Sequence, residues 1–325
     1  MADEDIHGGL QDEPWEERTL HLLYDSKIDQ DFSIAKVQKS GRKKHKVRWM
    51  SKRSMAIPQV IIKLQDQALR ESTLRCLSTF LLEEVLAFSQ LMADGSLTLR
   101  ATKRLVNVLT LFQCIAANKE TRYKFVKSCV PNFLVPLILF DSPSEIYENV
   151  RAVALSVFGI LCQAREPEII QWTLESNMVE VCQISIEIGS ELSKVIGMHI
   201  FEAIMQDESG MSYICSPICD QLLKILINTW EHLVYITSVT CLALDQDFSP
   251  RLLFHIIRSY VLLCTHVRGF SIVMDNLPDS IIDKSFGDLS VEFPLIGSLL
   301  HQLRLTVGKI DDYCPDFLPN DLLLY

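Results

Sequence analysis

The sequence is poor in glycine and has none of the short motifs that carry catalysis. Only 12 of its 325 residues are glycine, which favours helices and disfavours an all-β fold. It contains no GxSxG, HExxH, Walker or GxGxxG motif. No CxxC occurs, and the closest cysteine pair, Cys215 and Cys219, has no second pair nearby. We therefore expect no catalytic residue, no metal site and no cofactor.

Long hydrophobic runs and a secretion signal are also missing. No apolar stretch approaches the 18 or more residues of a membrane span. The opening Met-Ala-Asp-Glu-Asp lacks the basic and then apolar layout of a signal peptide. The ten cysteines are therefore expected in a reducing compartment, where they serve as small core residues, and no membrane partner is expected.

Charge is distributed unevenly along the chain. The formal net charge is −10, so the surface as a whole does not indicate nucleic-acid binding. Acidic residues dominate from Ala2 to Asp31, and basic residues dominate from Lys39 to Arg53. Opposed charge blocks with few aliphatic residues predict a disordered tail over residues 1–56. The basic block 39–53 is typical of a nuclear localisation signal, a nucleic-acid contact or a solvated linker, and the sequence leaves these alternatives open.

What the chain does contain is a repeated helical pattern. Apolar segments at 107–114, 152–162 and 195–205 are each followed by an acidic corner and a shorter apolar helix. A period of about 40–47 residues indicates an armadillo or HEAT solenoid. We predict an all-α, right-handed armadillo solenoid of about five to six repeats over residues 57–308. Such folds usually present a groove to a partner, and they seldom enclose a catalytic cavity.

Helix punctuation gives the expected boundaries. Gly95 ends a first periodic run that starts near Gln59, and Asn118 closes a long helix from about Leu99 to Ala117. Residues 142–145 form a capping box, and Ser190 opens a helix ending near Gln206. A last helix is expected over 295–307, followed by a frayed tail over 309–325. Further corners are expected at Pro167, Pro217, Pro250 and Pro278, and core positions at Leu109, Leu155 and Ile196.

Several polar residues are candidates for a groove surface. Arginines at the edges of apolar helices suit an acidic peptide or a phosphate backbone. The alternative is that their stems pack on the core while their charged heads stay solvated. His255 and Arg258 are one helical turn apart, which favours an interaction surface over catalysis. The predicted groove residues are Arg122, Arg151, His255, Arg258, Tyr260 and Arg268.

Two strings of residues resemble one known family. They are Gly-Ser-Glu-Leu-Ser-Lys at 189–194 and Arg-Leu-Leu-x-His-x-x-Arg-x-Tyr at 251–260. With Glu120-Thr121-Arg122, they make the chain similar to the Rcd-one family, the armadillo-repeat subunit of the Ccr–Not deadenylase complex. The resemblance runs from about Leu74 to Leu303, and residues 1–58 do not share it.

The resemblance implies a non-enzymatic adaptor in the cytoplasm and the nucleus. Family members bind the Not scaffold subunit through early helices, and surface pockets take short motifs of recruiter proteins. Tethering of this kind raises the concentration of a nuclease near its transcript, which leads to poly(A) shortening and mRNA decay.

This chain departs from the family pattern in two places. On the scaffold-docking helix, Thr73 and Thr79 replace the expected His and Ala, and Leu86 replaces Val. At a partner pocket, Ile218 and Asp220 replace the Tyr and Arg of the family, which reverses a charge. A groove that binds single-stranded nucleic acid, or a peptide-binding scaffold released from the complex, remains an alternative. Self-association into a homodimer is left open.

Overall fold

The computed structural model describes residues 67–141, 145–243, 249–283 and 285–308. The chain divides into two units, Met1–Ile57 and Pro58–Tyr325, and every described residue lies in the second. Several predictions fall outside the described ranges: the tail 1–56 with its basic block 39–53, residues 142–144 of the capping box, and the tail 309–325. Within the described ranges, no helix is long and apolar enough to cross a bilayer.

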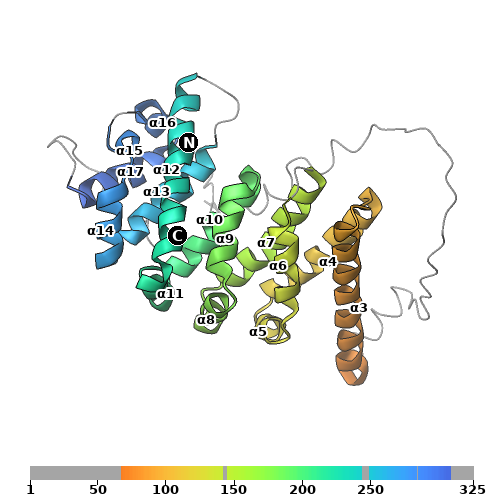
Figure 1. The fold of residues 1–325 in the computed structure, drawn as a ribbon. Coiled ribbons are helices and arrows are strands. Elements are labelled where there is room, and N and C mark those ends of the chain that lie inside the picture. Colours follow the sequence, from red (N-terminus) through yellow and green to blue (C-terminus); the bar gives the residue numbers. More distant parts are fainter. Residues whose placement is uncertain (1–66, 142–144, 244–248, 284, 309–325) are drawn as a thin grey trace, which may run out of the picture. The chain divides into compact units, whose positions relative to one another are not determined.

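All regular secondary structure in the described residues is helical (Figure 1). The first two helices are α3 (Gln67–Ala93) and α4 (Leu99–Ala117). Four groups follow, in which η marks a 3-10 helix. The first group is α5 (Lys119–Lys127), η2 (Val130–Leu134), α6 (Val135–Leu139) and α7 (Glu145–Gln163), and the second is α8 (Pro167–Glu175), α9 (Met178–Ile188) and α10 (Glu191–Met205). The third group is α11 (Glu208–Ile214), η3 (Pro217–Cys219), α12 (Asp220–Ala243) and α13 (Pro250–Leu263), and the fourth is α14 (Val267–Asn276), α15 (Asp279–Ile282), α16 (Gly287–Glu292) and α17 (Pro294–Thr306).

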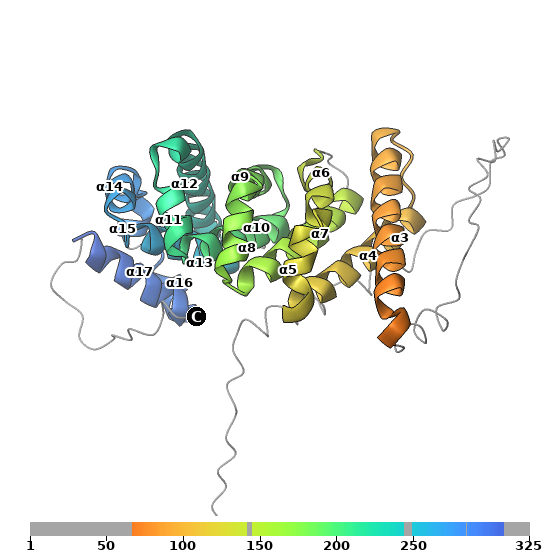
Figure 2. The same ribbon diagram turned by 90° about the horizontal axis from the view of Figure 1, so that it is seen from below.

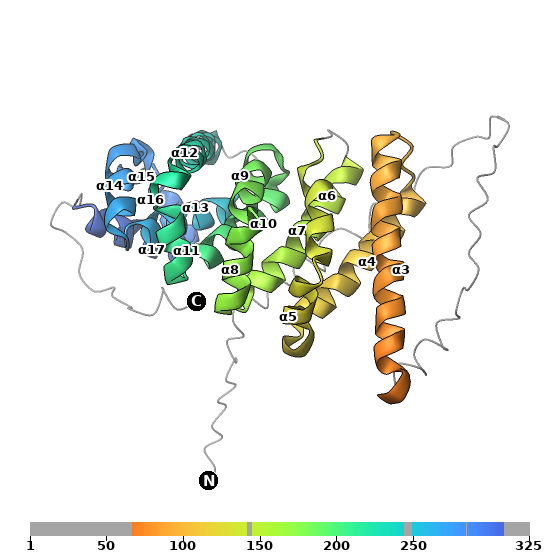
Figure 3. The same cartoon turned by 60° about the horizontal axis from the view of Figure 1, so that its bottom comes forward.

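Equivalent helices of successive groups pack on one another in rows. The long third helices form one row in the order α4, α7, α10, α13 and α17. The second helices form another row, α6, α9, α12 and α15, and the short first helices α5, α8 and α11 form a third. Figures 2 and 3 show the groups following one another in chain order. This three-helix repeat is that of an armadillo solenoid, which confirms the predicted fold class.

Local capping explains where the helices begin and end. The Thr98 hydroxyl accepts a hydrogen bond from the Ala101 amide at 3.2 Å and opens α4. Asn118 closes α4, and its side chain accepts from the Glu120 amide at 2.9 Å, so the same residue opens α5. The predicted long helix Leu99–Ala117 is therefore confirmed at both ends. Pro167 and Pro250 each occupy a first helical position, as expected for an inter-helix corner.

The predicted core register is confirmed in three successive repeats. Leu109 on α4 and Leu155 on α7 are both 0% exposed, and Ile196 on α10 is 7% exposed. These residues lie on the row of long helices, so each is covered by the neighbouring repeat as well as by its own. The apolar pattern thus fixes which side of each long helix meets the next.

Replacing Leu109 with alanine should lower the free energy of unfolding by about 2–5 kcal/mol, because it removes a fully buried side chain and leaves a cavity. Leu111 lies two residues further along the same helix and is 46% exposed, so Leu111→Ala should cost less than about 0.5 kcal/mol. Urea unfolding of both variants and the wild type measures the difference. Equal losses for the two variants would contradict the assigned register.

Candidate functional site

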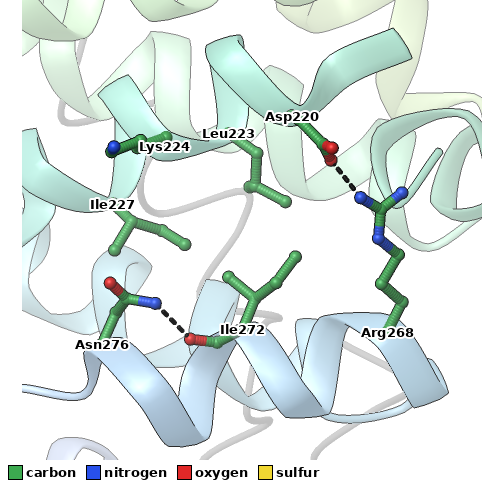
Figure 4. Close-up of a pocket in the computed structure, with 7 residues that line it drawn as sticks. All are labelled: Asp220, Leu223, Lys224, Ile227, Arg268, Ile272 and Asn276. Carbon is green, nitrogen blue, oxygen red and sulfur yellow. Dashed lines mark hydrogen bonds and ion pairs between the residues drawn. The ribbon is translucent and has the colours of Figure 1, made fainter. Parts of the chain in front are cut away.

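A groove of about 340 Å³ opens between α12 and α14 (Figure 4). Its floor is apolar, since Leu223 and Ile227 are each 1% exposed and Ile272 lies opposite them on α14. Its rim is polar and carries charges of both signs. The lining residues are Asp220, Leu223, Lys224, Ile227, Arg268, Ile272 and Asn276.

The two helices reach this position through short, well-defined corners. After α11, Pro217 starts the single turn η3, and Asp220 then begins α12. On the other side, the His266 ring nitrogen Nδ1 accepts from the Arg268 amide at 3.2 Å and opens α14. A side chain at Gly269 would place its Cβ 2.2 Å from the Leu263 carbonyl oxygen, so only glycine allows α14 to approach α13 this closely.

An ion pair joins the two sides of the groove at one end. The Arg268 guanidinium donates to an oxygen of Asp220, and it also donates to the Cys215 carbonyl at 3.0 Å. Because the Cys215 carbonyl lies at the end of α11, the guanidinium is held at a helix C-terminus, where a positive charge is favoured. Both side chains remain accessible, with 35% of Arg268 and 55% of Asp220 exposed. The charge of Arg268 is thus largely offset by Asp220.

Two of the most exposed apolar side chains of the described chain flank this ion pair in sequence. Ile218 is 82% exposed and lies two residues before Asp220, and Val267 is 90% exposed and precedes Arg268. The groove therefore combines an apolar floor, a nearly neutral charged rim and two apolar side chains at the corner. This arrangement suits a short peptide that inserts an apolar side chain.

The cysteines beside the corner do not have the properties of a reactive or metal-binding pair. Burial raises the pKa of the Cys215 thiol and of the Cys219 thiol, so both stay protonated near neutral pH. The described residues also hold no cluster of three or more His, Cys, Asp or Glu side chains suited to a metal ion.

Five of the six predicted groove residues are not on an accessible surface. Their exposed fractions lie between 0% and 9%, and Arg268 alone of the six is partly accessible. The expectation that they face a bound partner is therefore corrected: they serve the interior of the solenoid. The five residues are Arg122, Arg151, His255, Arg258 and Tyr260.

The two buried arginines of the early repeats close the C-terminal ends of helices. Arg122 donates to the carbonyls of Ala116 and Ala117, each at 2.7 Å, and so caps α4. Arg151 donates to Ile138 at 2.9 Å and to Phe140 at 2.6 Å, and so caps α6. Helix ends leave carbonyls without partners, and these arginines satisfy them from the following helix. Their heads are bonded to the backbone, so the alternative of solvated heads is also incorrect.

His255 and Arg258 meet a buried carboxylate that sequence spacing does not reveal. Glu202 on α10 is 2% exposed; one of its oxygens lies 2.9 Å from His255 Nδ1, and the other lies 3.9 Å from Arg258 Nε. Tyr260, on the same helix, is 0% exposed and packs against Trp230 with ring centroids 5.3 Å apart. This cluster joins α10 to α13 and lies too deep to receive a partner.

His199 borders this cluster and should make stability depend on pH. Burial, followed by the positive potential of His255, lowers the pKa of His199 from 6.5 to about 4. The folded state then binds fewer protons than the unfolded state between these values, so stability falls as pH drops through this window. A pKa lowered from 6.5 to about 4 corresponds to a loss of up to about 3 kcal/mol in the free energy of unfolding on acidification. In His199→Gln, unfolding free energies measured from pH 7 to pH 4 should decrease less steeply; an unchanged slope would refute this.

The residues expected on the scaffold-docking helix lie on α3. Leu86 is 44% exposed, and Thr79 is exposed one heptad earlier on the same side of the helix. Phe80, next to Thr79, is 54% exposed. Thr73 also belongs to α3, but its side chain lies outside the described part of the chain. Leu86 and Phe80 are therefore accessible apolar side chains on this helix, about a third of a turn apart around its axis.

Sequence reasoning found Asp220, Ile218 and Arg268 but assigned them to two different sites. The structure brings Asp220 and Arg268 together although 48 residues separate them. It also adds lining residues that carry no sequence motif, namely Leu223, Lys224, Ile227, Ile272 and Asn276. Their spacing of three to four residues along α12 and α14 shows which side of each helix faces the groove, but it does not show that the two helices are neighbours.

Comparison with known proteins identifies a family and several relatives to which this chain is similar. A model of the family described as "Cell differentiation family, Rcd1-like" matches residues 34–307. The expectation that residues 1–58 do not resemble that family is therefore wrong for residues 34–58, where the basic block obscures the sparse apolar residues.

Two curated relatives are similar over most of this chain. Cell differentiation protein rcd1 of Schizosaccharomyces pombe is 31% identical over 235 residues, which are 71% of this chain and 79% of that protein. Protein CAF40 of Saccharomyces cerevisiae is 28% identical over 233 residues, which are 71% of this chain and 60% of CAF40.

Solved structures with a similar course of the chain include designed armadillo repeat proteins. The design YIII(Dq)4CqI has a TM-score of 0.45 and 16% identity, with 78% of this chain and all of the design covered. A second design, YIII(Dq.V1)4CPAF in complex with the peptide (KR)4, has a TM-score of 0.45 and 15% identity over 78% of this chain and all of the design.

Proposed function

Because this chain belongs to the Rcd1-like cell differentiation family, we propose that it is a non-enzymatic adaptor subunit of the Ccr–Not deadenylase complex. In this role it links the deadenylase to proteins that recruit it, and so supports mRNA poly(A) shortening, mRNA decay and translational or transcriptional regulation. The observation that carries the proposal is the family match over residues 34–307. Its place of action is the cytoplasm and the nucleus.

Two accessible surfaces fit the two contacts that an adaptor makes. The α3 surface with Thr79, Phe80 and Leu86 would bind the Not scaffold subunit, since exposed apolar residues on one helix suit a helical partner. The α12–α14 groove would receive a short linear motif of a recruiter. Because Asp220 pairs with Arg268, this groove should prefer a motif with an apolar anchor and little net charge.

The peptide-binding alternative retains support from the same groove, whereas the nucleic-acid alternative loses part of its basis. The nucleic-acid alternative relied on four arginines. Arg122, Arg151 and Arg258 are buried, and Arg268 is paired with the carboxylate of Asp220. Phosphate recognition needs accessible positive charges and weakens as salt rises. The basic block 39–53 lies outside the described residues, so a nuclear localisation signal, a nucleic-acid contact and a solvated linker all remain alternatives for it.

The decisive experiment measures binding of the full chain to the armadillo-docking domain of the Not scaffold by calorimetry. We expect binding at about micromolar affinity or tighter. Leu86→Asp should weaken it at least about tenfold, because it places a charge in an apolar contact. Val291→Asp is the matched control, since Val291 is 83% exposed on the distant helix α16 and should bind normally.

Absence of binding would refute the adaptor role for this chain as it stands. Thr79→Ala tests the cause, because the smaller residue restores the one that the family resemblance leads us to expect at this position. Binding by Thr79→Ala alone would show a paralogue released from the complex, and the α12–α14 groove would then be its remaining interaction site.

A further inference from the structure

The two ends of the α12–α14 groove differ in charge. At one end, Asp220 and Arg268 pair with each other, so their charges largely cancel. Lys224 and Asn276 lie at the other end, as Figure 4 shows. Along α12, Asp220 and Lys224 are separated by about one helical turn, or about 6 Å. A ligand that lies along the groove therefore meets a neutral end and a positively charged end.

Of the three charged residues that line the groove, Lys224 alone has no ion pair with a described residue. Its side chain is exposed, and Figure 4 shows it extending away from Asp220, whose carboxylate is bonded to Arg268. The other two acidic residues of these helices, Glu231 on α12 and Asp275 on α14, do not line the groove. The lining residues therefore carry one positive charge that a ligand can neutralise.

The spacing between the apolar floor and this charge suits an extended peptide. Ile272 on α14 lies over the middle of the groove, and Asn276 follows it by one turn, or about 6 Å. In an extended chain, side chains two residues apart point to the same side and are separated by about 6.6 Å. Asn276 Nδ2 donates to the Ile272 carbonyl at 2.7 Å, which leaves the Asn276 side-chain oxygen as an acceptor for a ligand amide.

From these features we propose that the groove selects a short extended peptide with an acidic residue two positions from its apolar anchor. The anchor covers Ile272, and the carboxylate pairs with Lys224. At the opposite end Asp220 is 55% exposed and would repel the same carboxylate, so charge also fixes the direction in which the peptide lies. A phosphate backbone is a poorer match, because its binding depends on several accessible cations. This inference rests on the proposed role of the groove as the receptor for a recruiter motif.

The test measures binding of the full chain to synthetic peptides of about nine residues by NMR titration at low salt. Each peptide has a serine and glycine background and a central phenylalanine. One set carries aspartate, asparagine or lysine two residues after the phenylalanine, and a second set carries the same residues two positions before it. In one of the two sets, the aspartate peptide should bind about threefold more tightly than the asparagine peptide, as an exposed ion pair allows. Raising the salt concentration to about 0.5 M should remove most of this preference.

The protein variants assign the preference to one side chain. Lys224→Met keeps most of the apolar stem and removes the charge, so the aspartate and asparagine peptides should bind equally. Lys224→Glu should reverse the order, so that the lysine peptide binds best. Lys124→Met is the matched control, since Lys124 is an exposed lysine on α5, and it should keep the wild-type preference. Ile272→Ser should weaken all peptides without changing their order, and circular dichroism verifies that each variant is folded.

Three results would overturn the proposal. Equal binding of the aspartate and asparagine peptides by the wild type would leave a groove that does not select an acidic residue. A preference that persists in Lys224→Met would assign the carboxylate to another cation. Absence of binding by every peptide would remove the role of the groove as a receptor as well, whereas the adaptor role is decided separately by scaffold binding and its loss in Leu86→Asp.

Discussion

Replacing Glu202 with alanine is expected to lower the free energy of unfolding by about 3–5 kcal/mol. Glu202 is the acidic member of the buried cluster between α10 and α13, and its side chain is 3% exposed. Its removal leaves Arg258, 6% exposed, with no opposite charge at 3.9 Å, and takes away the hydrogen-bond partner of His255. Leaving the Arg258 charge buried without a partner costs more free energy than losing the attraction between the two charges.

The size of this effect is best established by urea unfolding with a matched control and a double-mutant cycle. Glu292→Ala removes an exposed glutamate at the end of α16 and should cost less than about 0.5 kcal/mol. The cycle consists of Glu202→Gln, Arg258→Met and the double variant that carries both changes. The double variant removes both charges together, so its loss should be smaller than the sum of the losses in the two single variants. Additive losses would show that Glu202 and Arg258 do not act as a pair.

The ends of many helices can be predicted from the sequence because capping is local. Thr98, Asn118 and Ser190 act within three residues of their own position, so their effect does not depend on the rest of the fold. The core register of Leu109 and Leu155 is likewise set by the apolar pattern of a single helix. The armadillo architecture follows from the repetition of these units, which must stack to bury their apolar sides.

Burial of the polar residues on α13 cannot be predicted in the same way. All residues from His255 to Leu263 are buried, because α13 contacts α10 on one side and α17 on another. A helix enclosed in this manner has no polar side, so periodicity cannot separate its interior from its surface. Arg258 therefore looks like a groove residue in sequence and is a core residue in the structure.

The groove has a different obstacle, because its two sides come from distant parts of the chain. Asp220 and Arg268 meet only because η3 turns the chain into α12 and the next repeat then returns along α14. The family resemblance predicts an acidic residue in place of a basic one at position 220, but it does not predict that Arg268 pairs with Asp220. Sequence reasoning therefore singled out position 220 and missed its ion-pair partner.

Replacing Arg151 with methionine is expected to lower the free energy of unfolding by about 3–5 kcal/mol, although the apolar stem is kept. The side chain is 1% exposed, and its guanidinium is bonded to the carbonyls of Ile138 and Phe140 and to Glu148. Methionine offers no donor, so the carbonyls of Ile138 and Phe140 at the end of α6 lose their partner. Arg151→Lys should recover part of the loss, because an ammonium group supplies charge but cannot reproduce the planar fork.

The effect should extend into the next repeat. Glu148, which Arg151 holds, also accepts a hydrogen bond from the Ser190 amide at 2.8 Å, and Ser190 caps α10. Amide hydrogen exchange in Arg151→Met should therefore accelerate at Ser190 more than at Glu120, whose amide donates to the side chain of Asn118, the cap of α5, at 2.9 Å. Arg251→Met, at an exposed arginine on α13, is the control and should leave both the stability and the Ser190 exchange unchanged. Acceleration of equal size at both amides would mean that Arg151 stabilises the solenoid as a whole and does not couple α7 to α10.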